Sequence, residues 1–273
     1  MIELFTEMFS YHFMTRAIIV GLLVSLCAAL LGVPLVLKRY SMIGDGLSHV
    51  GFGALAIAAA VNVAPLALAV PVVIAAAFLL LRINQSSRIK GDAAIALISS
   101  SALAIGVAVV SVTTGMNTDV SNYMFGSILS LSRADAVLSI ALSVIVLLMF
   151  VLLYPRIFAV TFDETFARAT GTKSQLYNTV IAVLTAVTVV IGMRMMGALL
   201  ISSLIIFPAL TAMRLCRSFK SVVACSSIVS VVCFVLGMTT SYALELPSGA
   251  SVVIVNIIAF LAFSFASLLK RKA

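Results

Sequence analysis

Two residues that could bind a metal ion together occur in an otherwise apolar stretch of the chain. Asp45 and His49 lie four positions apart in residues 44–49, Gly-Asp-Gly-Leu-Ser-His, and this spacing puts both side chains on one face of a helix. A carboxylate and an imidazole so placed can grip a divalent cation together. Ionisable residues in membrane spans are costly, so the pair predicts metal handling. The alternative is that His49 only hydrogen-bonds to Asp45 in a packed bundle.

The composition indicates a polytopic, all-α membrane protein. Hydrophobic residues make up 63% of the 273 residues and charged residues 10%, against about 25% charged in soluble domains. The net charge of +8 does not indicate a nucleic-acid partner, because the basic residues separate apolar runs and lack interleaved aromatics. The four cysteines form no CxxC pair, and we expect them to be small buried hydrophobic residues.

Nine apolar runs could cross the membrane, since a spanning helix needs about 20 mostly apolar residues. They are 17–37, 43–62, 65–81, 93–113, 136–154, 177–193, 197–213, 221–243 and 249–269. Some runs are short, so eight spans, with one pair only partly crossing, is the alternative. We expect residues 1–273 to form a single transmembrane domain.

Basic residues follow every odd-numbered run and predict the orientation of the chain. They are Lys38 and Arg39; Arg82, Arg88 and Lys90; Arg156, Arg168 and Lys173; Arg214, Arg217 and Lys220; and Lys270, Arg271 and Lys272. Arg194 departs from this alternation. The positive-inside rule then places the N-terminus outside and the C-terminus in the cytoplasm, which requires an odd number of spans and favours nine.

Two segments outside the spans have amphipathic helical patterns. Residues 1–13 are expected to lie on the outer surface. The cytoplasmic region 159–172 carries Phe162 and Phe166 at helical spacing, and Gly171 is expected to end its helix. Such a helix could pack on its own bundle or on lipid headgroups, or it could dock into a soluble partner.

Glycine and proline interrupt the apolar runs on the predicted outer side. One break is expected at 192–197, in a segment that continues to Pro208, and another at 245–250 around Pro247. Such breaks free backbone groups that can line a cavity, whereas the alternative is close helix packing by small residues. A third outer segment, 117–129, is expected to be a re-entrant or surface helix.

Four segments together resemble the permease subunits of bacterial zinc, manganese and iron ABC importers, the ABC-3 family. They are Asp45-Gly-Leu-Ser-His49, Tyr123-Met-Phe-Gly-Ser-Ile-Leu129, the run from Gly197-Ala-Leu-Leu200 to Pro208-Ala209, and Leu246-Pro-Ser-Gly249. The order of spans and breaks also resembles the type II importers for siderophores and cobalamin, which have one extra N-terminal span. The resemblance therefore implies a type II importer-like fold in a bacterial cell membrane.

The resemblance also implies partners and residue roles. It implies a homodimeric pore, a cytoplasmic ABC ATPase dimer that uses the ATP, and an extracytoplasmic metal-binding protein. The chain itself would be neither an enzyme nor a cofactor-binding protein, and the metal, expected to be zinc with manganese or iron as alternatives, would be its cargo. Asp45 and His49 would contact this cation. The segment that couples to the ATPase would include Phe162, Asp163, Glu164, Phe166, Ala167 and Gly171, with Glu164 and Arg168 on its polar rim. The outer gate would include Gly197, Pro208, Pro247 and Gly249.

Two other function classes fit the residues less well. A self-sufficient, ion-coupled secondary transporter would need intramembrane charges on several spans and commonly an internal repeat, and neither is evident. An intramembrane enzyme would need a nucleophile or a second cluster of metal ligands, which the sequence lacks. Asp92 is a further candidate for cation contact, but a stabilising acid at a helix N-terminus is its expected role.

Overall fold

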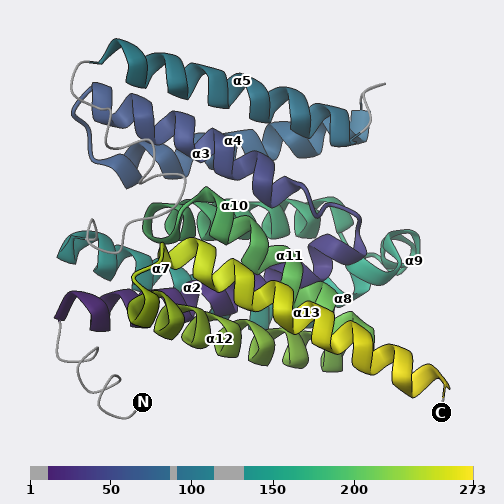
Figure 1. The fold of residues 1–273 in the computed structure, drawn as a ribbon. Coiled ribbons are helices and arrows are strands. Elements are labelled where there is room, and N and C mark those ends of the chain that lie inside the picture. Colours follow the sequence, from purple (N-terminus) through teal and green to yellow (C-terminus); the bar gives the residue numbers. More distant parts are fainter. Residues whose placement is uncertain (1–11, 87–90, 114–131, 273) are drawn as a thin grey trace.

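The computed structural model describes residues 12–86, 91–113 and 132–272, and every regular element in these ranges is a helix (Figure 1). The long helices are α2 (His12–Leu37), α3 (Ile43–Ala60), α4 (Pro65–Ser86), α5 (Gly91–Val112), α7 (Arg133–Leu152), α10 (Ser174–Met196), α11 (Ala198–Leu215), α12 (Phe219–Leu244) and α13 (Ser248–Lys272). Two short helices, α8 (Tyr154–Phe162) and α9 (Glu164–Ala169), connect α7 to α10. The helix predicted at 117–129 and all but the end of the predicted segment 1–13 lie outside the described residues.

Eight of the described helices are long and apolar enough to cross a membrane, and α11 is a shorter apolar helix. The 18 residues of α11 rise about 27 Å, close to the roughly 30 Å of a bilayer hydrocarbon core. Figure 1 shows α2 beginning at one end of the bundle and α13 ending at the opposite end. This arrangement agrees with an odd number of crossings, in which α11 is the additional one.

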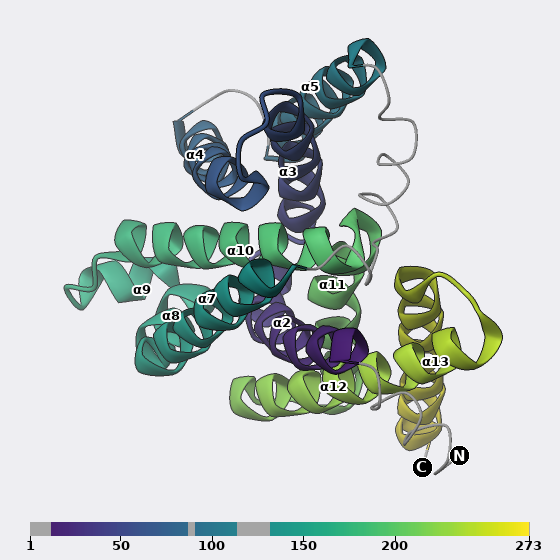
Figure 2. The ribbon, with the colours of Figure 1, turned by 90° about the vertical axis from the view of Figure 1, so that its left-hand side faces the viewer.

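The helices are arranged in two groups with α10 between them. Helices α3, α4 and α5 form one group, while α2, α7, α11, α12 and α13 form the other (Figure 2). Helix α10 packs against α3 and α4 on one side and against α2 and α11 on the other. It is accordingly among the most buried of the spans.

Glycines allow α3 and α5 to approach each other closely. A Cβ atom on Gly53 would lie 2.8 Å from the carbonyl oxygen of Ala102, and one on Gly106 would lie 2.7 Å from the ring of Phe52. A Cβ atom on Gly46 would lie 2.6 Å from the side chain of Ile95. The glycine-rich sequence around Asp45 therefore fixes α3 against α5, and this packing determines which way the polar residues of α3 face.

The predicted break at 192–197 is narrower than expected, which corrects the prediction from sequence. Helix α10 continues to Met196, and only Gly197 leaves the helix, with φ 85° and ψ 161°. Residues other than glycine rarely adopt this backbone conformation. Gly192 stays helical, and a Cβ atom there would lie 2.4 Å from Ile201, so its role is close packing.

Arg194, which departs from the charge alternation, is neutralised within the protein. Its guanidinium donates to Asp135 Oδ2 at 2.8 Å, and both side chains are 16% exposed. Asp135 lies in the first turn of α7 beside the capping residue Ser132. Because the charge of Arg194 is paired, it does not act as an independent topology signal.

The segments that follow the first, third and fifth predicted spans meet at one end of α10. Lys38, after α2, contacts Glu164 on α9, and Arg82, near the end of α4, lines one pocket with Gln175 and Thr179 of α10. The Arg194–Asp135 pair and the Lys38–Glu164 pair thus mark opposite ends of α10. All four cysteines are unpaired thiols; Cys27 and Cys233 are buried, as expected, whereas Cys216 and Cys225 are only half-buried.

Candidate functional site

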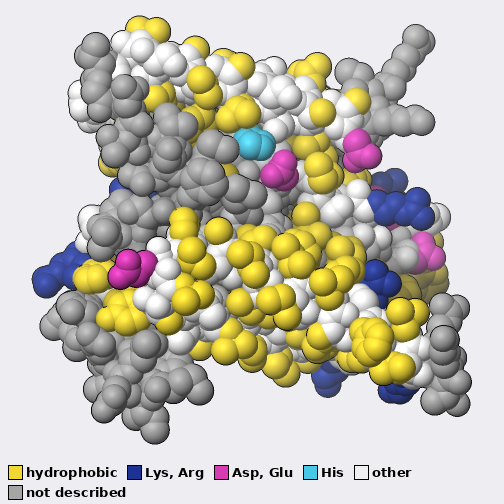
Figure 3. Space-filling model, in the orientation of Figure 1, with side chains coloured by type: hydrophobic (Ala, Val, Ile, Leu, Met, Phe, Trp, Pro, Cys, Tyr) yellow, Lys and Arg dark blue, Asp and Glu magenta, His cyan; other side chains and the backbone are white. Residues whose placement is uncertain are grey.

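Asp45 and His49 face each other on the first two turns of α3. His49 Nε2 lies 3.7 Å from Asp45 Oδ2, which is longer than a hydrogen bond. The side chain of Asp45 is 42% exposed and that of His49 is 23% exposed. Figure 3 shows a histidine and a neighbouring acidic side chain on this surface, between the group containing α3–α5 and an extensive apolar surface. The simple hydrogen-bonded pair, the alternative interpretation of the sequence, is therefore not formed.

Ser202 joins this pair from α11, a role that the sequence did not suggest. Its Oγ donates to Asp45 Oδ1 at 3.3 Å, so that Oδ2 is the carboxylate oxygen directed at His49. The same hydroxyl lies 3.1 Å from the carbonyl of Ala198 and can donate to only one acceptor at a time. Asp45 and Ser202 are 157 positions apart, and no spacing rule predicts a contact between residues so distant in sequence. The only feature of the sequence that could have drawn attention to Ser202 is the pair of serines shortly after Gly197.

The distance between the pair suits two ligands of one metal ion. An ion about 2.0–2.2 Å from each ligand atom would separate a nitrogen and an oxygen by roughly 3 to 3.5 Å, so a small side-chain movement closes the 3.7 Å gap. Within the described ranges, Asp45 and His49 have no third His, Cys, Asp or Glu that could complete a metal site. Asp92 is exposed in the first turn of α5, which fits its expected role at a helix N-terminus.

The predicted coupling region folds as two helices instead of one. Asp163 adopts an extended conformation between α8 and α9, and its carboxylate accepts a hydrogen bond from the backbone N–H of Phe166 at 2.9 Å. This cap ends one helix and begins the next, so Phe162 and Phe166 belong to different helices. Both rings remain exposed, at 68% and 65%. Gly171, with φ 82°, follows α9 as expected for a residue that ends a helix.

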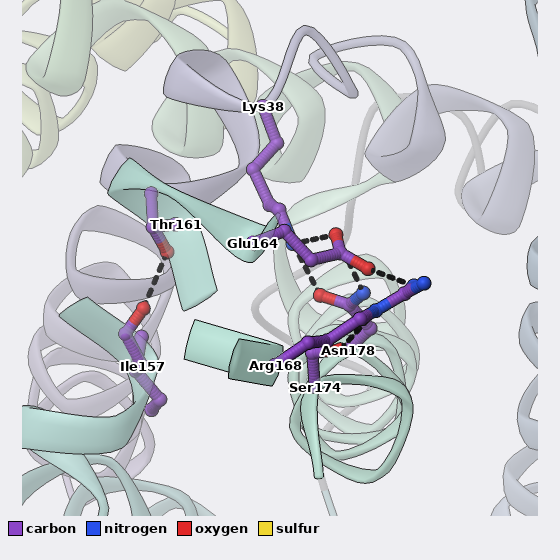
Figure 4. Close-up of polar contacts among 7 residues, drawn as sticks. All are labelled: Lys38, Ile157, Thr161, Glu164, Arg168, Ser174 and Asn178. Carbon is purple, nitrogen blue, oxygen red and sulfur yellow. Dashed lines mark hydrogen bonds and ion pairs between the residues drawn. The ribbon is translucent and has the colours of Figure 1, made fainter. Parts of the chain in front are cut away.

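Glu164 makes polar contacts with the bundle while its side chain stays 32% exposed, and its place on the polar rim of a docking surface stays a prediction. Its Oε2 accepts from Asn178 at 3.1 Å and from Lys38 at 3.4 Å, and its Oε1 accepts from Arg168 at 2.6 Å (Figure 4). Arg168 also donates to Ser174 Oγ at 2.7 Å. Burial raises the pKa of the Glu164 carboxyl, but its hydrogen bonds outweigh that effect and hold the pKa below its ordinary value.

Three of the four residues predicted for the outer gate lie at helix ends, and the fourth lies inside a helix. Gly197 separates α10 from α11, and Pro247 precedes Ser248, the first residue of α13. Gly249 lies in the first turn of α13. Pro208 lies well inside α11, about 16 Å along the helix from Gly197. The structure therefore places three of them at helix ends and the fourth within a helix, and their role as a gate stays a prediction.

Comparison with known proteins relates this arrangement to a transport family. A model of the ABC 3 transport family matches residues 10–267. The manganese import system permease protein ScaB of Streptococcus gordonii is 29% identical, over 99% of this chain and 98% of its own. The manganese transport system membrane protein MntC of Listeria monocytogenes is 30% identical, over 96% of this chain and 94% of its own.

A solved structure shows the same fold. A chain of PsaBC from Streptococcus pneumoniae, solved in complex with Fab, superposes with a TM-score of 0.86 at 29% identity, covering 96% of this chain and 95% of that chain. The predicted fold class, an all-α polytopic membrane protein like the type II importers, is thereby confirmed. Because the family model spans almost the whole sequence, the chain belongs to the ABC 3 transport family.

Proposed function

We propose that this chain is the permease subunit of an ATP-driven importer of divalent metal ions. Two copies would form the pore, a separate pair of ABC ATPases would hydrolyse the ATP, and an extracytoplasmic metal-binding protein would deliver the ion. The chain itself would not be an enzyme. The observation that carries this proposal is the geometry of Asp45 and His49, two metal-ligand side chains 3.7 Å apart on one helix face. Membership of the ABC 3 transport family supports it.

The exposure of the pair supports a second copy of the chain. A carboxylate that is 42% exposed on a spanning helix cannot face lipid without a large cost. Such residues in membrane proteins face a bundle interior or a water-filled cavity. A second copy packed over this face would enclose the pair in a pore and could supply further ligands to the ion.

Manganese is a better-supported cargo than zinc. Two relatives that match nearly their whole length carry names of manganese import or transport systems. The ligand chemistry favours neither strongly, because imidazole suits zinc and carboxylate suits manganese. We therefore infer manganese as the cargo, with zinc, the metal expected from the sequence, and iron as the alternatives.

The exposed rings of Phe162 and Phe166 are the proposed contact with the ATPase. Large exposed side chains at a helix junction outside the membrane suit insertion into a groove of a soluble protein. The segment from Phe162 to Gly171 would then lie in the cytoplasm, at the end of the bundle where Lys38 and Arg82 also lie. This orientation puts the C-terminus in the cytoplasm and the N-terminus outside.

Alanine substitutions at Asp45 and His49 test the contact with the ion. Each should abolish manganese uptake by cells or proteoliposomes containing the complete importer, while the amount of protein in the membrane stays near normal. Asp92→Ala is the matched control, because Asp92 is also a first-turn acid of a spanning helix. Normal uptake by the Asp45→Ala/His49→Ala double variant would exclude the proposed contact.

The choice of metal has its own test. Uptake of radioactive manganese and zinc is compared in wild type and in His49→Asp. If manganese is the cargo, the added carboxylate should retain part of the uptake, because manganese accepts oxygen ligands readily. Transport of zinc alone by the wild-type importer would refute the assignment of manganese without affecting the role of Asp45 and His49.

Substitution of Phe166 tests the docking surface. Phe166→Asp should leave the permease inserted but prevent the ATPase from co-purifying with it, because a helix-in-groove contact depends on a few anchor side chains. Thr170→Asp is the control, since it adds the same charge to an exposed position at the end of α9 without removing a ring. Co-purification of Phe166→Asp at wild-type yield would move the docking site elsewhere, with the loop between Arg82 and Lys90 next.

A further inference from the structure

Lys38 is a cation almost enclosed by protein at the end of α2. Its side chain is 10% exposed, and its Nζ donates to Asn178 Oδ1 on α10 and to Glu164 Oε2 on α9. Figure 4 shows the Lys38 side chain reaching this group, in which Asn178 also donates to Glu164. One side chain thus connects the end of α2 to the consecutive helices α9 and α10, through residues 126 and 140 positions later in the chain.

Helix α9 is joined to α8 and α10 along the chain and packs on both, and Glu164 gives it a direct polar link to the end of α2. Ala167 is the only one of its six residues that is buried. Its remaining contacts with the spans include the hydrogen bonds of Glu164 and Arg168 to Lys38, Asn178 and Ser174. A shift of α9 would therefore act directly on the end of α2 through Glu164 and Lys38, in addition to any displacement passed on by α8 and α10.

From Lys38 the chain leads directly to the candidate metal ligands. Asp45 lies seven residues after Lys38, in the first turn of α3. The intervening turn is tied by backbone hydrogen bonds, in which Tyr40 donates to the last turn of α2 at 2.8 Å and Ile43 donates to Tyr40 at 3.0 Å. Because this turn is short and internally bonded, displacement of Lys38 would carry over to the start of α3.

We propose that Lys38 is a positioning residue that transmits movement of α9 to Asp45 and His49. It would receive the displacement of α9 through Glu164 and pass it along the α2–α3 turn, altering the distance between Asp45 on α3 and Ser202 on α11. The ion would then be held in one state of the ATPase and released in another. This inference rests on the proposed function, in which α9 docks on the ATPase.

The physical chemistry of the Lys38 side chain does not suggest a purely stabilising role. Burial lowers the pKa of its ammonium group, against the opposing influence of Glu164. Desolvation of a buried ion pair offsets much of its attraction, so apolar residues would hold these helices together at least as well. A directional, charged contact does, however, make the position of one helix depend on that of another.

The test is the ratio of metal imported to ATP hydrolysed in proteoliposomes containing the complete importer. Lys38→Met removes the charge and keeps most of the side-chain volume. We expect it to retain the ATPase and its hydrolysis but to lower this ratio by about tenfold, within the range seen for residues on coupling networks. Arg39→Met is the control, because Arg39 is the neighbouring exposed cation, and its ratio should be unchanged.

A second substitution tests whether Lys38 acts through Glu164. Glu164→Gln should lower the ratio by a similar factor, and Lys38→Met in the Glu164→Gln background should lower it little further. A structural role would reduce hydrolysis and uptake together and leave the ratio unchanged, which would overturn the inference. If Lys38→Met fails to insert, an unchanged ratio in Glu164→Gln overturns it equally.

The outcomes separate this inference from the proposed function. Loss of co-purification in Phe166→Asp and loss of uptake in Asp45→Ala would support the docking surface and the ion contact, whatever the result at Lys38. If Phe166→Asp retains the ATPase, docking at α9 fails first, and with it the route through Lys38. If Phe166→Asp loses the ATPase and Asp45→Ala loses uptake, the docking surface and the ion contact both hold. If Lys38→Met then keeps the wild-type ratio of metal imported to ATP hydrolysed, only the transmission role is refuted.

Discussion

Substitution of Ser202 by alanine is the most direct test of the geometry around Asp45. The change removes the donor 3.3 Å from Asp45 Oδ1 and leaves the backbone of α11 intact. A hydrogen bond to a charged group contributes about 1.5–3 kcal/mol. This one is long, is shared with the carbonyl of Ala198, and serves a carboxylate that is 42% exposed, so water can replace part of it. We expect a loss of about 1 kcal/mol in ion binding, or about fivefold.

The measurement is the manganese concentration that gives half-maximal uptake in proteoliposomes, which should rise about fivefold in Ser202→Ala. Ser203→Ala is a closely matched control. Ser203 is the next residue and is also buried, but its hydroxyl donates to the carbonyl of Leu200 within α11. Unchanged uptake in Ser202→Ala, or an equal effect in both variants, would refute the idea that Ser202 orients Asp45 toward the ion.

Three further predictions concern the spans and their ends. Gly197→Ala should lower the free energy of unfolding by about 1–3 kcal/mol, because φ 85° with ψ 161° suits only glycine; thermal unfolding in detergent measures it. Arg194→Met should destabilise by about 3 kcal/mol by leaving the largely buried Asp135 unpaired, and Arg194→Met/Asp135→Asn should recover much of this loss. A reporter fused after Lys272 should indicate the cytoplasm and one at the N-terminus the outside; a shared side would contradict an odd number of crossings.

The sequence alone was sufficient for the features that depend on local pattern and composition. Apolar runs of spanning length predict helices in lipid because every backbone group must be satisfied internally. The spacing of Asp45 and His49 predicts that they share a helix face, and the structure agrees. The end of α9 at Gly171 could also be predicted, because the conformation beyond a helix end commonly requires glycine.

Other local predictions were wrong because contacts with neighbouring atoms, and not composition, determine where these helices begin and end. Gly192 belongs to the predicted break, yet it stays helical, and Ile201 of α11 fills the space where a Cβ atom would lie, so this glycine serves close packing. Phe162 and Phe166 have the spacing of one stripe, yet Asp163 turns its carboxylate onto a backbone N–H and divides the segment into two helices. Competition between helix propagation and capping is too finely balanced to be decided from spacing alone.

Only the tertiary structure decided which distant residues meet. Ser202 reaches Asp45, Lys38 reaches Glu164, and Asp135 neutralises Arg194, and each pair joins different helices. Helix periodicity determines the face on which a side chain lies, but the rotation of each helix about its axis comes from packing against its neighbours. For α3 that packing is the close contact of its glycines with α5, and it leaves Asp45 and His49 partly exposed, so that an ion can reach both.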